Sequence, residues 1–366
     1  MGDTRKVPSR MKAAVLVGPD RLEIQEVATP LPGPAEILIR VEACAVCSSD
    51  VSLISKPWLG QPPYGSFVPG HEYAGTVAGL GPGVDEFKVG DRVAVEAHLG
   101  CLRCINCRRG NYTACLNFGR PEKGHRANGF TTNGGFAQYV VNHLNTVYSI
   151  PDSIEFDEAS LLTNLGCVLY GFETLGGYIV GENVVVIGPG PLGLISVQVA
   201  KALGAKRVFL LGTRESRLRV GTKVGADRVI NIQKEDPLPV ILSETGEIGA
   251  DVVVETSGGD EAPQMAIQLA KRMGKILMLG LPSRPVMVDF TLLVNWNKTL
   301  FTVRGEGRAN CARGISLLAD GKVDLKALLT HRFPLEKISE AFDTFVERKS
   351  GAIKVVVNPN ADGVKG

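Results

Sequence analysis

The sequence predicts an α/β protein in which a mostly-β first part precedes a doubly wound parallel sheet. Up to about Pro151, short strand-like segments alternate apolar and polar residues between turns, as half-buried antiparallel strands do. From about Cys167, near-continuous runs of Val, Ile and Leu alternate with amphipathic helices, which is typical of a parallel sheet covered on both faces. The 366 residues are enough for two domains with separate cores.

The individual elements follow from the same periodicities. In the first part, strands are expected at residues 11–17, 22–27, 36–44, 73–80, 91–97, 137–142 and 146–150. In the second part, strands at 183–188, 207–212, 250–256 and 275–280 alternate with helices at 192–204, 215–225 and 262–272. After about Arg304 the sequence predicts helices at 311–321 and 336–349 and a last strand at 353–358.

Composition and charge exclude several classes of function. Lys and Arg total 40 against 38 Asp and Glu, so we expect neither a nucleic-acid partner nor a membrane surface. The start of the chain, MGDTRKVPSR, lacks the apolar region of a signal peptide. The apolar stretches are too short to span a bilayer. These features predict a cytoplasmic enzyme.

Four cysteines lie within the run CLRCINCRRGNYTAC: Cys101, Cys104, Cys107 and Cys115. Thiolates at this spacing can surround one tetrahedral Zn²⁺, which takes four such ligands in a closed structural site. A pair of disulfides would need an oxidising compartment, and a redox CxxC pair would leave two cysteines unused. We therefore expect a structural zinc that stabilises a loop and takes no part in chemistry.

A glycine motif opens the helix that follows the first strand of the second part. It reads G-P-G-P-L-G, and the expected cofactor-binding residues are Gly188, Gly190, Leu192 and Gly193. Such glycines permit a tight turn, a close approach to a pyrophosphate and close packing of helix on strand. The helix N-terminus then offers free N–H groups to the phosphates. The motif predicts a nicotinamide dinucleotide.

The end of the next strand bears on which dinucleotide binds. An NAD site usually has an acidic residue there, which binds the ribose 2′-hydroxyl. This chain has Gly212, which leaves room for a 2′-phosphate, followed by Thr213 and Arg214, which can bind it. We therefore expect NADP(H) rather than NAD(H).

A second set of metal-ligand types occurs in the first part. Cys47 lies in CSSD, and His71 and Glu72 lie in PGHEYAG. Zn²⁺ accepts a thiolate, an imidazole and a carboxylate, and a catalytic zinc keeps one position open for substrate. Cys47 could instead be a buried apolar residue or pair with Cys44, and His71 could be a hydrogen-bonded core histidine.

Together these motifs resemble those of the medium-chain zinc-dependent alcohol dehydrogenases, from about Met11 to Asn358. The family's zinc signature GHExxGxxxxxGxxV matches Gly70, His71, Glu72, Gly75, Gly81 and Val84. The cysteine cluster and the glycine motif follow in the family's order. The branch with polyol, threonine and secondary-alcohol dehydrogenases is the most similar in length and in the CxSD motif.

The resemblance implies an organisation and a reaction. It implies a GroES-like catalytic domain with the structural zinc loop at 1–164, a Rossmann domain at 165–303 and a return to the catalytic domain at 304–366. It further implies hydride transfer between NADP(H) and a secondary alcohol or polyol, or the corresponding ketone. Cys47 and His71 would ligate a catalytic zinc, Asp50 would orient a ligand, and Ser49 would hydrogen-bond the substrate oxygen.

The chain departs from the family pattern at two places. Ser52 stands where many members have the histidine that ends a proton relay. The remaining zinc ligand is expected near Thr163 or Asn164, neither of which is a usual ligand. Glu72 is the favoured replacement, and Cys167 is the alternative.

The substrate and the partners are less closely specified. The aromatic residues expected in or near the cleft loops are Trp58, Tyr64, Phe118 and Trp296. The segment from Val286 to Gly305 resembles the family's subunit-pairing edge, which implies a homodimer or homotetramer. Two other functions on the same fold remain open: a reductase of activated double bonds, and a non-catalytic NADPH-binding protein.

Overall fold

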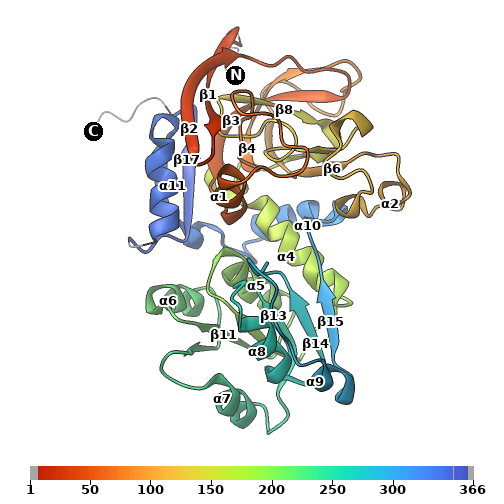
Figure 1. Cartoon of the computed structure of the whole chain (residues 1–366), viewed down its shortest axis with the longest axis vertical. Coiled ribbons are helices and arrows are strands. Elements are labelled where there is room, and N and C mark those ends of the chain that lie inside the picture. Colours follow the sequence, from red (N-terminus) through yellow and green to blue (C-terminus); the bar gives the residue numbers. More distant parts are fainter. Residues whose placement is uncertain (1–6, 349, 362–366) are drawn as a thin grey trace. The chain divides into compact units, whose positions relative to one another are not determined.

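The computed structural model describes residues 7–348 and 350–361 and confirms the α/β class (Figure 1). The chain forms two compact units. The first contains the chain up to Thr163, Gly305–Ile315 and the segment from Leu329 onward, and the second contains Asn164–Arg304 and Ser316–Leu328. Residues 304–366, expected as one returning segment, are thus divided between the two units.

The first unit is built on a seven-stranded sheet of order β16-β17-β3-β4-β5-β9, with β8 also paired to β3. Its strands are β3 (Glu36–Ala45), β4 (Glu72–Leu80), β5 (Arg92–Val95), β8 (Tyr139–His143), β9 (Val147–Ser149), β16 (Leu329–Pro334) and β17 (Lys354–Asn358). A hairpin of β1 (Arg10–Gly18) and β2 (Arg21–Ala28) lies outside this sheet. The pairing is antiparallel except between β16 and β17.

The register of β3 brings distant parts of the chain to one end of this sheet. Ala45 pairs with Glu72 of β4 and with Val356 of β17. The last strand of the protein therefore lies beside the strand that precedes Cys47. Helix α11 (Ile338–Glu347) packs against β17 (Figure 1). The helix predicted at 336–349 is shorter in the structure: residues 336–337 belong to a 3-10 helix (Leu335–Lys337), and residue 349 lies outside the described residues.

The second unit contains a six-stranded sheet of order β12-β11-β10-β13-β14-β15, in which every pairing is parallel. Its strands are β10 (Asn183–Ile187), β11 (Arg207–Gly212), β12 (Arg228–Asn231), β13 (Ala250–Glu255), β14 (Ala270–Met278) and β15 (Thr299–Thr302). The chain runs outward from β10 to β12 and then restarts at β13. A ligand site is expected where the strand order reverses, at the carboxyl ends of β10 and β13.

The three helices predicted for the second unit are present, and α7 (Pro237–Glu244) and α9 (Phe290–Asn295) occur in addition to them. Helices α5 (Pro191–Ala202) and α6 (Glu215–Lys223) lie where they are expected. Helix α8 (Ala262–Leu269) ends before residue 272, because Ala270 already pairs with Ala250 in the sheet. Among the described residues, no helix combines the length and the apolar character needed to cross a membrane.

Candidate metal centres and cofactor site

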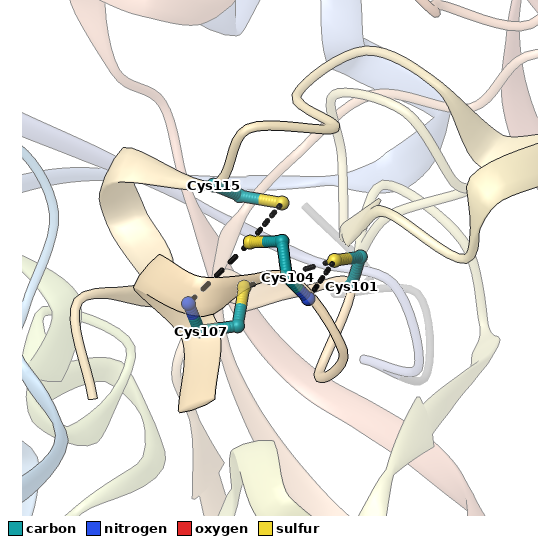
Figure 2. Close-up of side chains that lie close together, drawn as sticks. All are labelled: Cys101, Cys104, Cys107 and Cys115. Atoms are coloured by element: carbon teal, nitrogen blue, oxygen red, sulfur yellow. Dashed lines mark hydrogen bonds between the residues drawn. The ribbon is translucent and has the colours of Figure 1, made fainter. Parts of the chain in front are cut away.

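The four clustered cysteines gather beside β6 (His98–Gly100) and α2 (Ile105–Arg108). Figure 2 shows their sulfur atoms turned toward one another, and all lie within 4.8 Å. Cys101 Sγ is 3.9 Å from Cys107 Sγ, and Cys104 Sγ is 4.0 Å from Cys115 Sγ. Two thiolates on a tetrahedral zinc are about 3.8 Å apart for Zn–S bonds of about 2.3 Å. The cluster therefore fits a zinc ion.

The surrounding N–H groups favour the thiolate form of Cys101, whereas burial raises the pKa of Cys107 and of Cys115. Cys101 Sγ accepts hydrogen bonds from the Cys104 backbone N–H (3.3 Å) and from Asn117 Nδ2 (3.2 Å). Burial alone would raise the pKa of Cys101, but these N–H donors outweigh it and lower the pKa to about 6. Gly100 permits the close approach, since a Cβ there would lie 2.8 Å from Cys107 Sγ. None of the eight cysteines, all of which lie within the described residues, forms a disulfide.

A second cluster of donors lies where β3 ends and β4 begins. Cys47 is the N-cap of α1 (Ser48–Ser55), His71 directly precedes β4, and Glu72 is its first residue. One ligand atom of each lies within 4.8 Å of the others. Asp50 Oδ2 accepts the Cys47 N–H (2.9 Å), and Asp50 Oδ1 lies 3.1 Å from His71 Nδ1. Asp50 thus orients two of the three donors and leaves His71 Nε2 for a metal.

Ser49 completes this group from the first turn of α1. Its hydroxyl lies 3.2 Å from Cys47 Sγ and 3.2 Å from His71 Nε2. One thiolate, one imidazole and one carboxylate form a donor set that Zn²⁺ accepts. The residues present therefore fit a catalytic zinc, with a hydroxyl placed beside it.

Lys354 was not expected in this group. It is 1% exposed, its Nζ donates to Glu72 Oε2, and it also donates to the Val46 carbonyl at 3.2 Å. Burial opposes the charge on Lys354, but the Glu72 carboxylate outweighs it and raises the pKa of Lys354. The pKa of His71 is raised in the same way by Asp50, against burial. The same carboxylates, Asp50 and Glu72, would attract a bound metal ion, which would take the place of a proton at His71 Nε2.

Aromatic rings lie next to the second cluster. Phe130 contacts His71 at a centroid distance of 4.4 Å, Trp58 at 5.3 Å and His98 at 5.6 Å. His98 Nδ1 lies 3.0 Å from Glu306 Oε2, and its Nε2 is buried without a hydrogen-bond partner among the described residues. Sequence reasoning identified Trp58 but missed Phe130 and His98.

The other predicted aromatic residues do not join this group. Phe118 packs edge-on against His125, and Trp296 lies over Arg272, whose guanidinium carbon is 3.6 Å from the ring centroid. Tyr64 is 39% exposed. Phe118 and Trp296 thus have packing partners of their own.

The residues of the two departures lie on α1 and α4 (Leu162–Thr174). Ser52 is exposed on α1. Thr163 is 3% exposed, and its hydroxyl has no hydrogen-bond partner among the described residues. Asn164 and Cys167 belong to the second unit. Glu72 is the carboxylate found beside Cys47 and His71, and Cys167 as a ligand stays a prediction.

The glycine motif forms the turn between β10 and α5. Gly188 has φ +102°, and a Cβ on Gly193 would lie 1.8 Å from the Gly188 carbonyl oxygen, so only glycine fits at either position. Gly190 is the N-cap of α5, and a Cβ there would meet nothing within 4 Å. Leu192 follows in the first turn and is partly exposed. The motif therefore leaves open space over the helix N-terminus, as a bound pyrophosphate requires.

The structure gives Gly212 a second reason to be glycine. A Cβ on Gly212 would lie 2.5 Å from two ring carbons of Pro189, so this residue is constrained by packing against the motif itself. A glycine here does not by itself distinguish NADP from NAD. Thr213 and Arg214 are exposed, and no described salt bridge includes Arg214. The nearby acid, Glu215, is paired with Lys234 at 2.7 Å.

Comparisons with known proteins extend this picture. Residues 33–152 match the model of the alcohol dehydrogenase GroES-like domain, and residues 191–320 match that of zinc-binding dehydrogenases. The chain is 35% identical to sorbitol dehydrogenase of Bacillus subtilis over 98% of this chain and 99% of that protein. The chain belongs to the zinc-dependent medium-chain alcohol dehydrogenase family.

Other members of the family are similar over nearly the whole length. L-threonine 3-dehydrogenase of Pyrococcus abyssi is 36% identical over 90% of this chain and 94% of its own. A protein from Sinorhizobium meliloti, solved bound to NADP, superposes with a TM-score of 0.87 at 28% identity, over 96% of this chain and 100% of its own. These dehydrogenases support alcohol oxidoreduction as the activity of this fold.

Proposed function

We propose that the protein transfers a hydride between NADP(H) and a secondary alcohol or polyol, or its ketone, with one structural and one catalytic zinc. The observation that carries this proposal is the donor group Cys47, His71 and Glu72, with the Ser49 hydroxyl beside it. When bound there, zinc would polarise the substrate oxygen, and the nicotinamide would exchange the hydride.

The chain's own residues then have separate tasks. Asp50 holds His71 and Cys47 in place and stays buried. The Ser49 hydroxyl lies beside these ligands and would relay the proton that an alcohol loses, taking up that proton as it passes its own to water. Phe130 and Trp58 supply an apolar wall that excludes water from this point.

The substrate class rests on two further features. The relatives named for sorbitol and threonine are named for molecules that carry polar groups beside a secondary hydroxyl. The buried Nε2 of His98, without a partner among the described residues, supports a substrate with a second polar group. We therefore place a polyol ahead of a plain alkyl alcohol.

The preference for NADP(H) depends on Arg214 rather than on Gly212. Arg214 is exposed at the N-cap of α6 and takes part in no described ion pair, so it is available to a 2′-phosphate. Arg214→Ala should raise the Kd for NADPH by about tenfold or more, the value of one charge-assisted contact, and leave that for NADH within about twofold. Equal losses for both cofactors would contradict the preference.

We also propose a homodimer or homotetramer formed along the edge strand β15. This strand has one sheet neighbour, and its sequence TLFT contains none of the charges that usually protect an edge. Met287, Phe290 and Val294, in the segment before it, are 94%, 61% and 73% exposed. A cytoplasmic location is proposed because the zinc ligands need reduced cysteines.

The reaction is tested by following NADP⁺ and NAD⁺ reduction with a panel of polyols, simple secondary alcohols and β-hydroxy amino acids. Cys47→Ser should abolish turnover. Cys44→Ala is the matched control, because Cys44 lies three residues away in the core and outside the donor group. Undiminished turnover by Cys47→Ser, or turnover only with enones, would overturn the proposed reaction.

A further inference from the structure

A buried carboxylate lies at the carboxyl end of β13, where the strand order reverses. Glu255 is 0% exposed. Its Oε1 accepts three hydrogen bonds from the loop that follows: from the Ser257 N–H (2.6 Å), the Ser257 hydroxyl (2.5 Å) and the Gly258 N–H (3.0 Å). A carboxylate that accepts several such bonds fixes the backbone around it more firmly than a neutral acceptor does.

The loop at 256–259, which Glu255 holds, braces the glycine turn. Thr256 Oγ1 donates to the carbonyls of Ile187 (2.8 Å) and Gly188 (3.0 Å). Ser257 lies so close to Gly188 that a Cβ on that glycine would be 2.8 Å from Ser257 Cβ. The position of Ser257, set by Glu255, is therefore transmitted to the turn at the start of α5.

Gly280, two residues after the end of β14, lies against the other side of Glu255. The Gly280 N–H donates to the Glu255 carbonyl at 2.9 Å. A Cβ on Gly280 would lie 2.2 Å from Glu255 Oε2, an oxygen without a hydrogen-bond partner among the described residues. Glu255 thus joins the carboxyl ends of β10, β13 and β14.

We propose that Glu255 is a positioning residue for the nicotinamide half of the cofactor and acts through the 256–259 loop. This inference rests on the proposed function. In a doubly wound sheet the two halves of a dinucleotide lie on opposite sides of the point where the strand order reverses. By this rule the adenosine ribose would face the end of β11 (Arg207–Gly212), which Arg214 closely follows. Glu255 ends β13 on the other side, so its loop would face the nicotinamide half.

Calorimetric titration of Glu255→Gln with two ligands separates this role from general stability. The first ligand is the preferred cofactor, NADPH or NADH, and the second is its adenosine fragment, 2′,5′-ADP or 5′-AMP. Loss of the charge should weaken the whole cofactor about tenfold, as for one charge-assisted hydrogen bond. The fragment does not reach the nicotinamide half, so its Kd should change less than about twofold.

Asp251→Asn is the matched control. Asp251 is the half-buried second residue of the same strand, near the end opposite Glu255; it accepts the Asn183 N–H at 2.7 Å and pairs with Lys271. This variant should lower the melting temperature and leave both Kd values within about twofold. If Glu255→Gln does not fold, Ser257→Ala serves in its place, because Ser257 is exposed and contributes one of the donors.

The outcomes are distinct. A loss confined to the whole cofactor supports the inference. Equal weakening of cofactor and fragment overturns it in favour of a general structural role, and unchanged binding of both overturns it outright. Wild-type protein that binds neither NADPH nor NADH overturns the proposed function as well.

Discussion

Removal of the Lys354 ammonium tests whether Glu72 can serve as a zinc ligand. Lys354→Met keeps the length of the side chain but leaves the Glu72 carboxylate buried without its cation. The two side chains are 2% and 1% exposed, so water cannot replace the lost partner. Breaking a buried pair in this way costs about 3–5 kcal/mol. The zinc-free variant should be less stable by that amount.

A zinc ion bound beside Glu72 changes this result. Its positive charge replaces that of Lys354, so most of the cost should disappear when zinc binds. Zinc should then stabilise the variant more than the wild type, by at least about 2 kcal/mol. By linkage, this corresponds to zinc binding tightened by about thirtyfold.

The assay is urea unfolding of both proteins, with and without zinc, together with zinc titration against a competing chelator. Zinc content should be measured in each sample to show that the four-cysteine site stays filled, so that the samples with and without zinc differ only at the site beside Glu72. Lys12→Met is the matched control, because its pair with Glu336 is 2.7 Å long and the two side chains are 47% and 53% exposed. An exposed pair contributes about 0–1 kcal/mol, and zinc should not affect this cost.

Two results would refute the reasoning. Equal stabilisation of wild type and Lys354→Met by zinc would show that Glu72 is not next to the metal. A cost below about 1 kcal/mol in the zinc-free protein would show that the pair is not buried as described.

Three further predictions follow from other parts of the protein. Cys104→Ser should lower the zinc content by one ion per chain and reduce the melting temperature. Cys311→Ser, outside the cluster, should leave the zinc content unchanged. Burial alone would raise the pKa of Glu36, but Arg126 and the Gly33 N–H outweigh it and lower that pKa below its ordinary 4.5. The stability that ionised Glu36 contributes is present above pH 4.5 and is lost as the pH falls through the lowered pKa. Glu36→Gln should therefore flatten the loss of stability in acid melts. An unchanged slope would contradict this. Leu300→Lys, which puts a charge on β15, should shift the assembly to a smaller species in light scattering, whereas an unchanged mass would exclude this edge as the interface.

Sequence patterns predicted the parallel sheet well where strands are long and apolar. The expected strands at 183–188, 207–212, 250–256 and 275–280 correspond to β10, β11, β13 and β14. Strand β12 and helix α7 (Pro237–Glu244) were missed. β12 has four residues, and α7 begins with a proline-containing turn that hides its periodicity. The N-cap Asp236 was the signal that could have found α7.

The candidate site was predictable only as far as its residues lie in short motifs. The run of four spaced cysteines, the CSSD motif and the GHE motif together contain every member of the two donor groups. Lys354 could not be found that way, because it is 282 residues from Glu72 and meets it only through the pairing of β17 with β3. A lone Lys in the apolar run IKVVVN was the available signal. Phe130 carries no such signal, since its role comes from the rings around it.

The most direct test of the central claim is the zinc content per chain of purified wild type and of Cys47→Ser. The account predicts two ions in the wild type and one in the variant, with the four-cysteine site retained and cofactor reduction lost. A single ion in freshly prepared, zinc-supplemented wild type, or two ions in Cys47→Ser, would contradict a catalytic zinc held by Cys47, His71 and Glu72.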